Sequence, residues 1–142
     1  MPLSPVKHIV KTSHKSGLSF ESGIDQYRFS MDTTSSESQG AGPSPKKLML
    51  ASLAGCTGID VVSILHKMKV PFSDFHVDVE AELTDEHPQI YHQVNIIYRI
   101  KVAEDDQSKM ERAVLLSKEK YCGVSAMFSH FAKLEFSIQF NQ

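Results

Sequence analysis

The sequence predicts an α+β fold with antiparallel sheets. Three observations lead to this prediction: strand-like segments come in groups, helical segments lie between the groups, and the two do not alternate strictly as in βαβ folds. With 142 residues, the chain is long enough for one domain and too short for two domains of ordinary size. We therefore expect a single domain over residues 1–142, with N-terminal strands at 1–32, a mobile loop at 33–42 and the main body at 43–142.

The first third of the chain is typical of short strands separated by turns. Residues 6–12, 18–20 and 27–31 have the strand pattern, and Gly17 separates the first two segments. Residues 33–42 are small and polar throughout. Such a segment cannot bury enough apolar area to order itself, so we expect a mobile loop there.

A long apolar helix is expected from Pro45 to Met68. Ser44 has the place of the N-cap and Pro45 that of the first helical residue, while Pro71 ends the segment. Apolar residues cover most of the circumference of this helix, and a helix of that kind is usually buried in the middle of a structure. We therefore expect it to be the structural centre of the protein.

The second half combines two long strands, two helices and a final strand. Apolar and polar residues alternate over 75–83 and over 94–102, with a turn around residues 86–88. A second helix should open at Ser108, because Ser108 and Glu111 have capping-box spacing, and should run towards Lys120. A short helix over 124–131 and an alternating strand over 134–140 complete the chain.

Composition and charge argue against some classes of function. The formal net charge is -2 and the basic residues form no continuous stripe, so nucleic-acid binding is not expected. The N-terminus has no apolar core of signal-peptide length, and no apolar stretch approaches the roughly eighteen residues of a membrane span. We therefore expect a cytoplasmic protein without a membrane partner. In that reducing compartment the two cysteines should be reactive or inert thiols, not a structural disulfide.

The two cysteines lie in unusual surroundings. Cys56 falls mid-helix between Gly55 and Gly58, and glycine inside a helix costs about 1 kcal/mol relative to alanine. These glycines would let a neighbouring chain or a substrate come close to the thiol. Cys122 lies where one helix ends and the next begins, and free N–H groups there would favour a thiolate. Free cysteines are also often small buried hydrophobes, and this alternative stays open.

Two segments of the chain resemble the OsmC/Ohr family of small thiol-dependent proteins. The run PSPKKLMLASLAGCTGIDVVSIL, residues 43–65, is similar to the cysteine helix of that family, and SKEKYCGVSAM, residues 117–127, to its second-cysteine motif. The turn over residues 86–91 and the strand after it also fit. The exact amino-acid sequence of both motifs is most similar to that of a less characterised OsmC-like branch.

The resemblance implies an intertwined homodimer in which antiparallel sheets wrap around long central helices, with active sites at the subunit boundary. Characterised members reduce organic hydroperoxides, in oxidative or osmotic stress defence. By this resemblance Cys56 would be the peroxidatic thiol and would form a sulfenic acid. Cys122 would resolve it as a disulfide, which an external dithiol then reduces. In part of the family that dithiol is lipoyl-linked.

The chain departs from the peroxidase members at the residues that would support the thiolate. Those members carry a glutamate directly after the proline that opens the helix, where this chain has Lys46, and they pair it with an arginine, for which Arg28 is the nearest candidate. Lys46 could replace part of that pair by lowering the pKa of Cys56, or it could be a solvated first-turn residue. Glu119, in the second motif, is a further candidate supporting residue.

Asp60 lies one turn after Cys56 on the same helix face. A bare carboxylate beside a thiol would raise the thiol pKa. Either Asp60 is paired, by Lys46, His14 or Lys15 from elsewhere in a dimer, or Cys56 is not strongly activated. Asp60 could also be an ordinary polar or dimer-contact residue.

Neither a metal site nor a cofactor is expected. The seven histidines form no ligand set with metal-binding spacing, and no glycine-rich phosphate loop follows a strand. The leading interpretation is an organic hydroperoxide peroxidase, which needs the two cysteines close enough to bridge, with Cα atoms about 4.4–6.8 Å apart. The alternative is a non-catalytic OsmC-like dimer that binds a small apolar or thiol-reactive ligand at the subunit interface.

Overall fold

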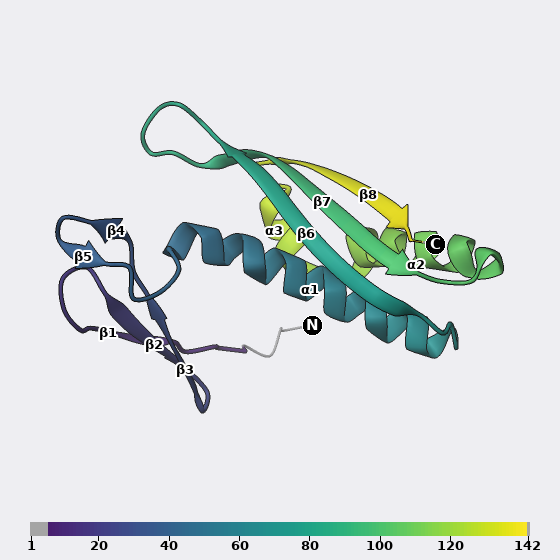
Figure 1. Ribbon diagram of the computed structural model, residues 1–142, viewed down its shortest axis with the longest axis horizontal. Helices are drawn as coiled ribbons and strands as arrows, with labels where there is room; N and C mark the ends of the chain where they lie inside the picture. The colour runs from purple at the N-terminus through teal and green to yellow at the C-terminus, as the bar shows by residue number, and fades with distance from the viewer. Residues whose placement is uncertain (1–5, 142) are drawn as a thin grey trace, which may run out of the picture. The chain divides into compact units, whose positions relative to one another are not determined.

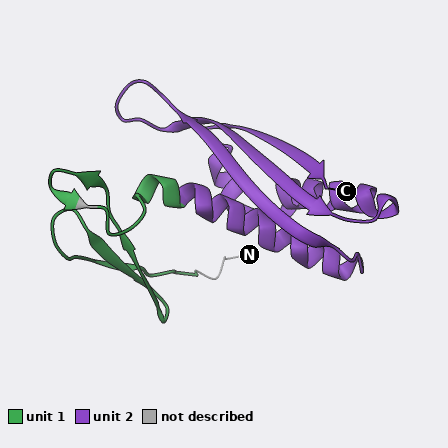
Figure 2. Ribbon diagram, in the orientation of Figure 1, with its two compact units in different colours: residues 1–48 green, residues 49–142 purple. Residues whose placement is uncertain are grey.

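The computed structural model describes residues 6–141, with the main chain alone at Gln39 (Figure 1). It confirms the predicted α+β class. The chain divides into two compact units, residues 1–48 and 49–142 (Figure 2). The single domain expected from the sequence stays a prediction.

The first unit contains a three-stranded antiparallel sheet in the order β1-β2-β3. Its strands are β1 (Lys11–His14), β2 (Phe20–Ile24) and β3 (Tyr27–Met31). The strand expected at 6–12 begins instead at Lys11. Lys11 pairs with Gly23, close to the end of β2, so residues 6–10 lie largely beyond the end of that strand.

The segment 33–42, expected to be a mobile loop, contains a two-stranded hairpin of β4 (Thr34–Ser35) and β5 (Ser38–Gln39). The buried carboxylate of Asp32 organises it. That carboxylate accepts hydrogen bonds from the Ala41 N–H at 2.8 Å and from the Ser38 hydroxyl. Polar bonding to one buried acid therefore supplies the order that apolar burial could not.

Helix α1 (Pro45–Lys67) begins at the predicted residue, and the Ser44 hydroxyl accepts a hydrogen bond from the Lys47 N–H at 3.4 Å. The helix is expected from the sequence to be the buried centre of the structure, and within one chain it is buried only in part. Only one stripe of α1 is buried, and Ile59 is 72% exposed. The stripe consists of residues at intervals of four, Leu53, Thr57, Val61 and Leu65.

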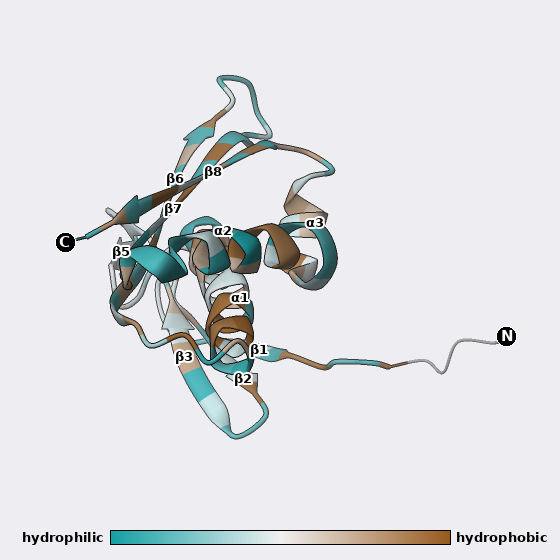
Figure 3. Ribbon diagram, turned by 90° about the vertical axis from the view of Figure 1, so that its right-hand side faces the viewer, coloured by the Kyte–Doolittle hydropathy of each residue, from teal (hydrophilic) through white to brown (hydrophobic). Residues whose placement is uncertain are grey.

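By length and composition α1 could also cross a membrane, in contrast to the expected absence of such a stretch. The core helix of a soluble protein passes the same test, so one such helix is weak evidence of a span. Figure 3 shows hydrophobic residues over several turns of α1. The helix therefore carries more apolar surface than the single chain covers.

The second unit is built on a three-stranded sheet in the order β6-β7-β8. β6 (Ser73–Leu83) and β7 (Tyr91–Lys101) are antiparallel, as expected, whereas β8 (Lys133–Phe140) runs parallel to β7. A parallel neighbour requires a long crossover. Helices α2 (Gln107–Leu116) and α3 (Gly123–Phe128) supply that crossover, and they lie with α1 on one face of the sheet (Figures 1 and 3).

The core of this unit lies between that helical layer and the sheet. Alternate residues of β7 face it and are buried. Apolar residues of α1, α2 and α3 pack against them. The fully buried members include Leu53, Val61, Leu65, Val94, Ile96, Tyr98, Ile100, Met110 and Ala113.

The expected capping box at Ser108 is wrong. A short 3-10 turn, η1 (Glu104–Asp106), precedes α2, which starts at Gln107 with Asp106 as its N-cap and no side-chain cap bond. Ser108 therefore lies inside the first turn of α2. The 3-10 turn starts the helical path earlier than the side-chain pattern indicates.

Candidate redox site at Cys56 and Cys122

The structure brings the two cysteines together with Asp60. The Sγ atoms of Cys56 and Cys122 and a carboxylate oxygen of Asp60 all lie within 4.8 Å of one another. Cys56 and Asp60 are one turn apart on α1, and Cys122 lies between η2 (Ser117–Tyr121) and α3. The two thiols are both free in this structure.

Cys56 is the more accessible thiol, half-buried on α1. Burial raises the pKa of Cys56, and the neighbouring Cys122 thiol and the Asp60 carboxylate raise it further. The Val124 N–H opposes this by donating a hydrogen bond to the sulfur. The balance of these effects raises the pKa of Cys56 above that of an ordinary thiol.

Cys122 is buried, with 3% of its surface exposed. As expected it stands between two helices, and it is the N-cap residue of α3. Its Sγ accepts a hydrogen bond from the Ser125 N–H at 3.3 Å, and the Ser125 hydroxyl donates to the Cys122 carbonyl at 3.1 Å. An external molecule can therefore reach Cys56 but not Cys122.

A chain of hydroxyl groups behind Asp60 was not found from the sequence. The Ser117 hydroxyl donates to the Asp60 carboxylate at 3.1 Å and lies 3.0 Å from the Thr57 hydroxyl, which in turn lies 2.6 Å from the Tyr98 hydroxyl. Burial raises the pKa of Tyr98 to about 12. One sequence signal was available: Thr57 is the one polar residue in the buried stripe of α1.

The turn that carries Cys122 has π-helical geometry. In η2 the Cys122 N–H donates to the Ser117 carbonyl at 2.8 Å, five residues back. This wider turn ends α2 and places Ser117 beside Asp60 and Cys122 beside Cys56. Such π-turns occur frequently at functional sites.

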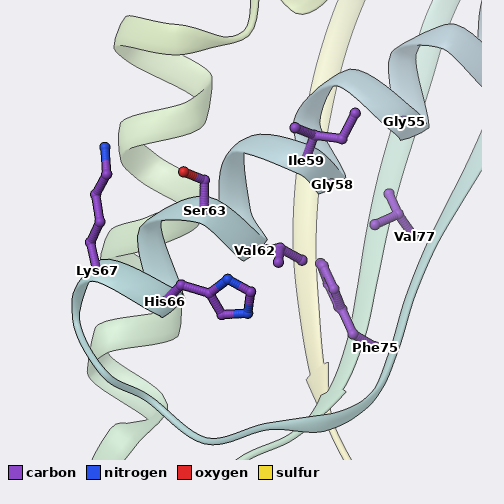
Figure 4. Close-up of a pocket in the computed structure, with 9 residues that line it drawn as sticks. All are labelled: Gly55, Gly58, Ile59, Val62, Ser63, His66, Lys67, Phe75 and Val77. Atoms are coloured by element: carbon purple, nitrogen blue, oxygen red, sulfur yellow. The ribbon is translucent and has the colours of Figure 1, made fainter.

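An apolar groove runs along α1, between that helix and β6 (Figure 4), and neither cysteine is among the residues that line it. It has a volume of about 740 Å³. A Cβ atom added at Gly55 would meet nothing within 4 Å, and one added at Gly58 would make ordinary contact with Val77. The groove is lined by Gly55, Gly58, Ile59, Val62, Ser63, His66, Lys67, Phe75 and Val77.

The other candidate supporting residues have the following surroundings in this structure. Arg28, on β3, is exposed and pairs with Glu21 at 3.4 Å. Lys46 lies in the first turn of α1, and Glu119 in η2; both are exposed, and neither is among the groups that shift the pKa of Cys56.

Asp60 has a neutral partner within one chain, the Ser117 hydroxyl. Of the cations considered from the sequence, Lys15 lies 3.8 Å from Glu21, and His14 bonds the Gly17 carbonyl at 2.9 Å. Pairing of Asp60 by a cation of a second chain stays a prediction.

Cys56, Asp60 and Cys122 are also the group of donor atoms, among residues 6–141, that could hold a metal ion. Two sulfurs and one oxygen would suit a soft or borderline metal. The sequence predicts no metal here, and this stays a prediction. The same two sulfurs lie within 4.8 Å of each other, and a disulfide between them stays a prediction.

Comparison with known proteins identifies the family. The family model of OsmC-like proteins matches residues 37–137. Protein YhfA of Escherichia coli K12 is 33% identical over 97 residues, which cover 68% of this chain and 72% of YhfA.

Solved structures share the fold over nearly the whole chain. A hypothetical protein from Aquifex aeolicus superposes with a TM-score of 0.85 and 28% identity, covering 96% of this chain and 98% of that chain. An organic hydroperoxide resistance protein OsmC from Legionella pneumophila has a TM-score of 0.66 at 15% identity, covering 96% and 99%. On the family match and the YhfA relationship, this chain belongs to the OsmC-like protein family.

Proposed function

We propose that this protein is a thiol-dependent peroxidase that reduces organic hydroperoxides through Cys56 and Cys122. The observation that carries the proposal is the approach of the two Sγ atoms to within 4.8 Å, with one thiol accessible and the other buried. An accessible thiol can meet a peroxide, and a buried neighbour can close a disulfide without meeting solvent first. The hydroperoxide resistance proteins that share this fold support the substrate class.

The reaction has three steps. The Cys56 thiolate attacks the peroxide O–O bond; an alkoxide leaves and takes up a proton to become the alcohol, and Cys56 becomes a sulfenic acid. Cys122 then attacks the sulfenic sulfur, so that an S–S bond forms, an S–O bond breaks and water leaves. An external dithiol, lipoyl-linked in our proposal, returns two electrons by thiol–disulfide exchange and releases both thiols.

We also propose that the working unit is an intertwined homodimer in the cytoplasm. Among the described residues of the first unit the buried ones are polar, Ser19, Ser22 and Asp32, so this unit has no apolar core of its own. Apolar residues on its strands, such as Phe20 and Tyr27, stay exposed. These residues on the first unit, and Ile59 on α1 in the second, are exposed apolar side chains of the kind that a second copy of the chain would cover.

A second candidate function is a non-catalytic dimer that binds a small apolar or thiol-reactive ligand at the subunit interface. The apolar groove beside Gly55 and the raised pKa of Cys56 favour it, because a protonated thiol next to an apolar surface is a poor nucleophile. The two functions differ in whether the Cys56 thiol is repeatedly oxidised by a peroxide and reduced again.

Steady-state reduction of cumene hydroperoxide with dihydrolipoamide separates these functions. We expect turnover by the wild type, none by Cys56→Ser, and a single turnover by Cys122→Ser, which then stalls as a sulfenic or higher acid. Steady-state activity retained by Cys56→Ser would show that the roles are wrongly assigned. A wild type that shows no turnover and no cysteine oxidation would favour the binding function.

A further inference from the structure

We propose that the Asp60 carboxylate accepts the thiol proton that is released when Cys56 and Cys122 form their disulfide, and that it exchanges protons with solvent. This inference rests on the proposed redox function of the two thiols. It assigns the proton-transfer step of disulfide formation to a residue of this chain.

Asp60 lies close to both sulfurs, as a proton acceptor must. One of its oxygens lies within 4.8 Å of both Sγ atoms, a gap that one water or a small side-chain rotation closes. Among residues 6–141 it is the carboxylate that groups with the two thiols in this way. Both thiols can therefore reach the same base.

A hydrogen-bonded group of hydroxyls holds the Asp60 carboxylate in place. Ser117 donates a hydrogen bond to it, and Ser117 is itself fixed by the buried hydroxyls of Thr57 and Tyr98. These three residues are positioning residues, since they touch Asp60 or one another rather than the sulfurs. The buried Ser117 hydroxyl contacts one side of the Asp60 carboxylate. The other side is free to face the thiols.

Asp60 also borders a route to solvent. It lines a hollow of about 300 Å³ between α1 and the α2–η2 segment, together with Lys67 and Tyr121. The titratable and charged groups around Asp60 are therefore Cys56 and Lys67 on α1, Cys122 and Tyr121 at η2, and Tyr98 on β7 through two hydroxyls. A proton taken from the thiols can leave through this hollow.

The buried thiol needs such an acceptor. Cys122 is 3% exposed, so its proton has little direct access to bulk water. In disulfide closure the Cys122 Sγ–H would pass its proton to Asp60, and the sulfur would attack the oxidised sulfur of Cys56. When that sulfur is a sulfenic acid, the departing hydroxide takes the proton from Asp60 and leaves as water.

The reaction with 5,5′-dithiobis(2-nitrobenzoate) tests this step without a peroxide. Attack by Cys56 releases the first thionitrobenzoate, and closure by Cys122 releases the second, so stopped-flow absorbance follows the two steps separately. Thionitrobenzoate leaves as an anion, so the second phase reports removal of the Cys122 proton. Asp60→Asn should slow the second phase by about 10²-fold at neutral pH, while the first phase becomes faster.

The opposite signs distinguish proton transfer from a simple charge effect. If Asp60 acted only by its negative charge, its removal would favour both thiolates and accelerate both phases, which would overturn the proposal. Slowing of both phases together with an altered circular dichroism spectrum would indicate damage to the fold and would also count against it. Glu80→Gln, on the exposed face of β6, is the matched control and should change neither phase.

Chemical rescue gives an independent readout. Asp60→Ala opens space next to the hollow, so added formate should restore the second phase in proportion to its concentration. In Asp60→Asn the second phase should become first order in hydroxide. Absence of rescue, with a second phase as fast as that of the wild type, would contradict the proposal. Because no peroxide is used, this result is independent of whether the protein is a peroxidase.

Discussion

The Thr57 and Tyr98 hydroxyls lie 2.6 Å apart, and both residues are completely buried between α1 and β7. Tyr98→Phe removes one hydroxyl and leaves Thr57 bonded to Ser117 alone. We expect a loss of about 1 kcal/mol in the free energy of unfolding, the usual net value of one buried hydrogen bond. Urea denaturation of the reduced protein measures it.

Tyr27→Phe is the control for that substitution, because Tyr27 is 65% exposed on β3 and should lose nothing measurable. Equal stability of Tyr98→Phe and the wild type would mean that the hydroxyl chain does not contribute to the fold.

Part of this site could be predicted from the sequence and part could not. Local patterns identified the start of α1 at Ser44 and Pro45 and the helix boundary at Cys122, because caps and alternation act over a few residues. The Thr57–Ser117 contact joins residues 60 apart in the chain. No local pattern contains such a contact, and the resemblance alone suggested that the cysteines meet.

In the fold, too, some features could be predicted from local sequence patterns and others could not. The alternation over 134–140 predicted β8, but alternation does not say whether a strand runs parallel or antiparallel to its neighbour. Composition predicted a loop at 33–42, yet the Asp32 carboxylate orders a hairpin there by polar bonds. Wherever the outcome depended on a distant partner, the sequence pattern was insufficient.

The alkylation of Cys56 should depend on pH in a defined direction. Burial, Cys122 and Asp60 all disfavour the thiolate, so the rate with iodoacetamide should reach half of its maximum above the ordinary thiol value of about 8.5. Raising the pH through that midpoint forms the thiolate. Cys122→Ser removes one raising group and should shift the midpoint downward. Peptide mass spectrometry assigns the alkylated cysteine, and a midpoint below the ordinary value would contradict the prediction.

The hypothesis that Lys46 replaces part of the missing acid–arginine pair has its own test. A nearby ammonium lowers a thiol pKa, so Lys46→Ala should slow the reaction of Cys56 with peroxide and raise its alkylation midpoint, with self-association unchanged. Lys47→Ala, the neighbouring first-turn lysine, is the control. An alkylation profile identical to that of the wild type would make Lys46 a solvated residue without a role in activation.

The exposed Ile59 should mark the surface that a second copy covers. Burial of one isoleucine side chain contributes about 1.5–3 kcal/mol, and a symmetric dimer would bury two. Ile59→Asp should therefore raise the dissociation constant of the dimer by at least about a hundredfold, as measured by analytical ultracentrifugation. Glu80→Gln should leave it unchanged. A folded wild-type monomer at micromolar concentration would contradict the dimer itself.

The most direct measurement of the central claim is intact mass spectrometry after one equivalent of cumene hydroperoxide, followed by peptide mapping. The account predicts a protein lighter by two hydrogen atoms, with one intrachain disulfide joining Cys56 to Cys122. Cys122→Ser should instead gain one oxygen atom at Cys56. If both cysteines stay reduced at modest peroxide excess, Cys56 and Cys122 are not a peroxidatic pair and the account is contradicted.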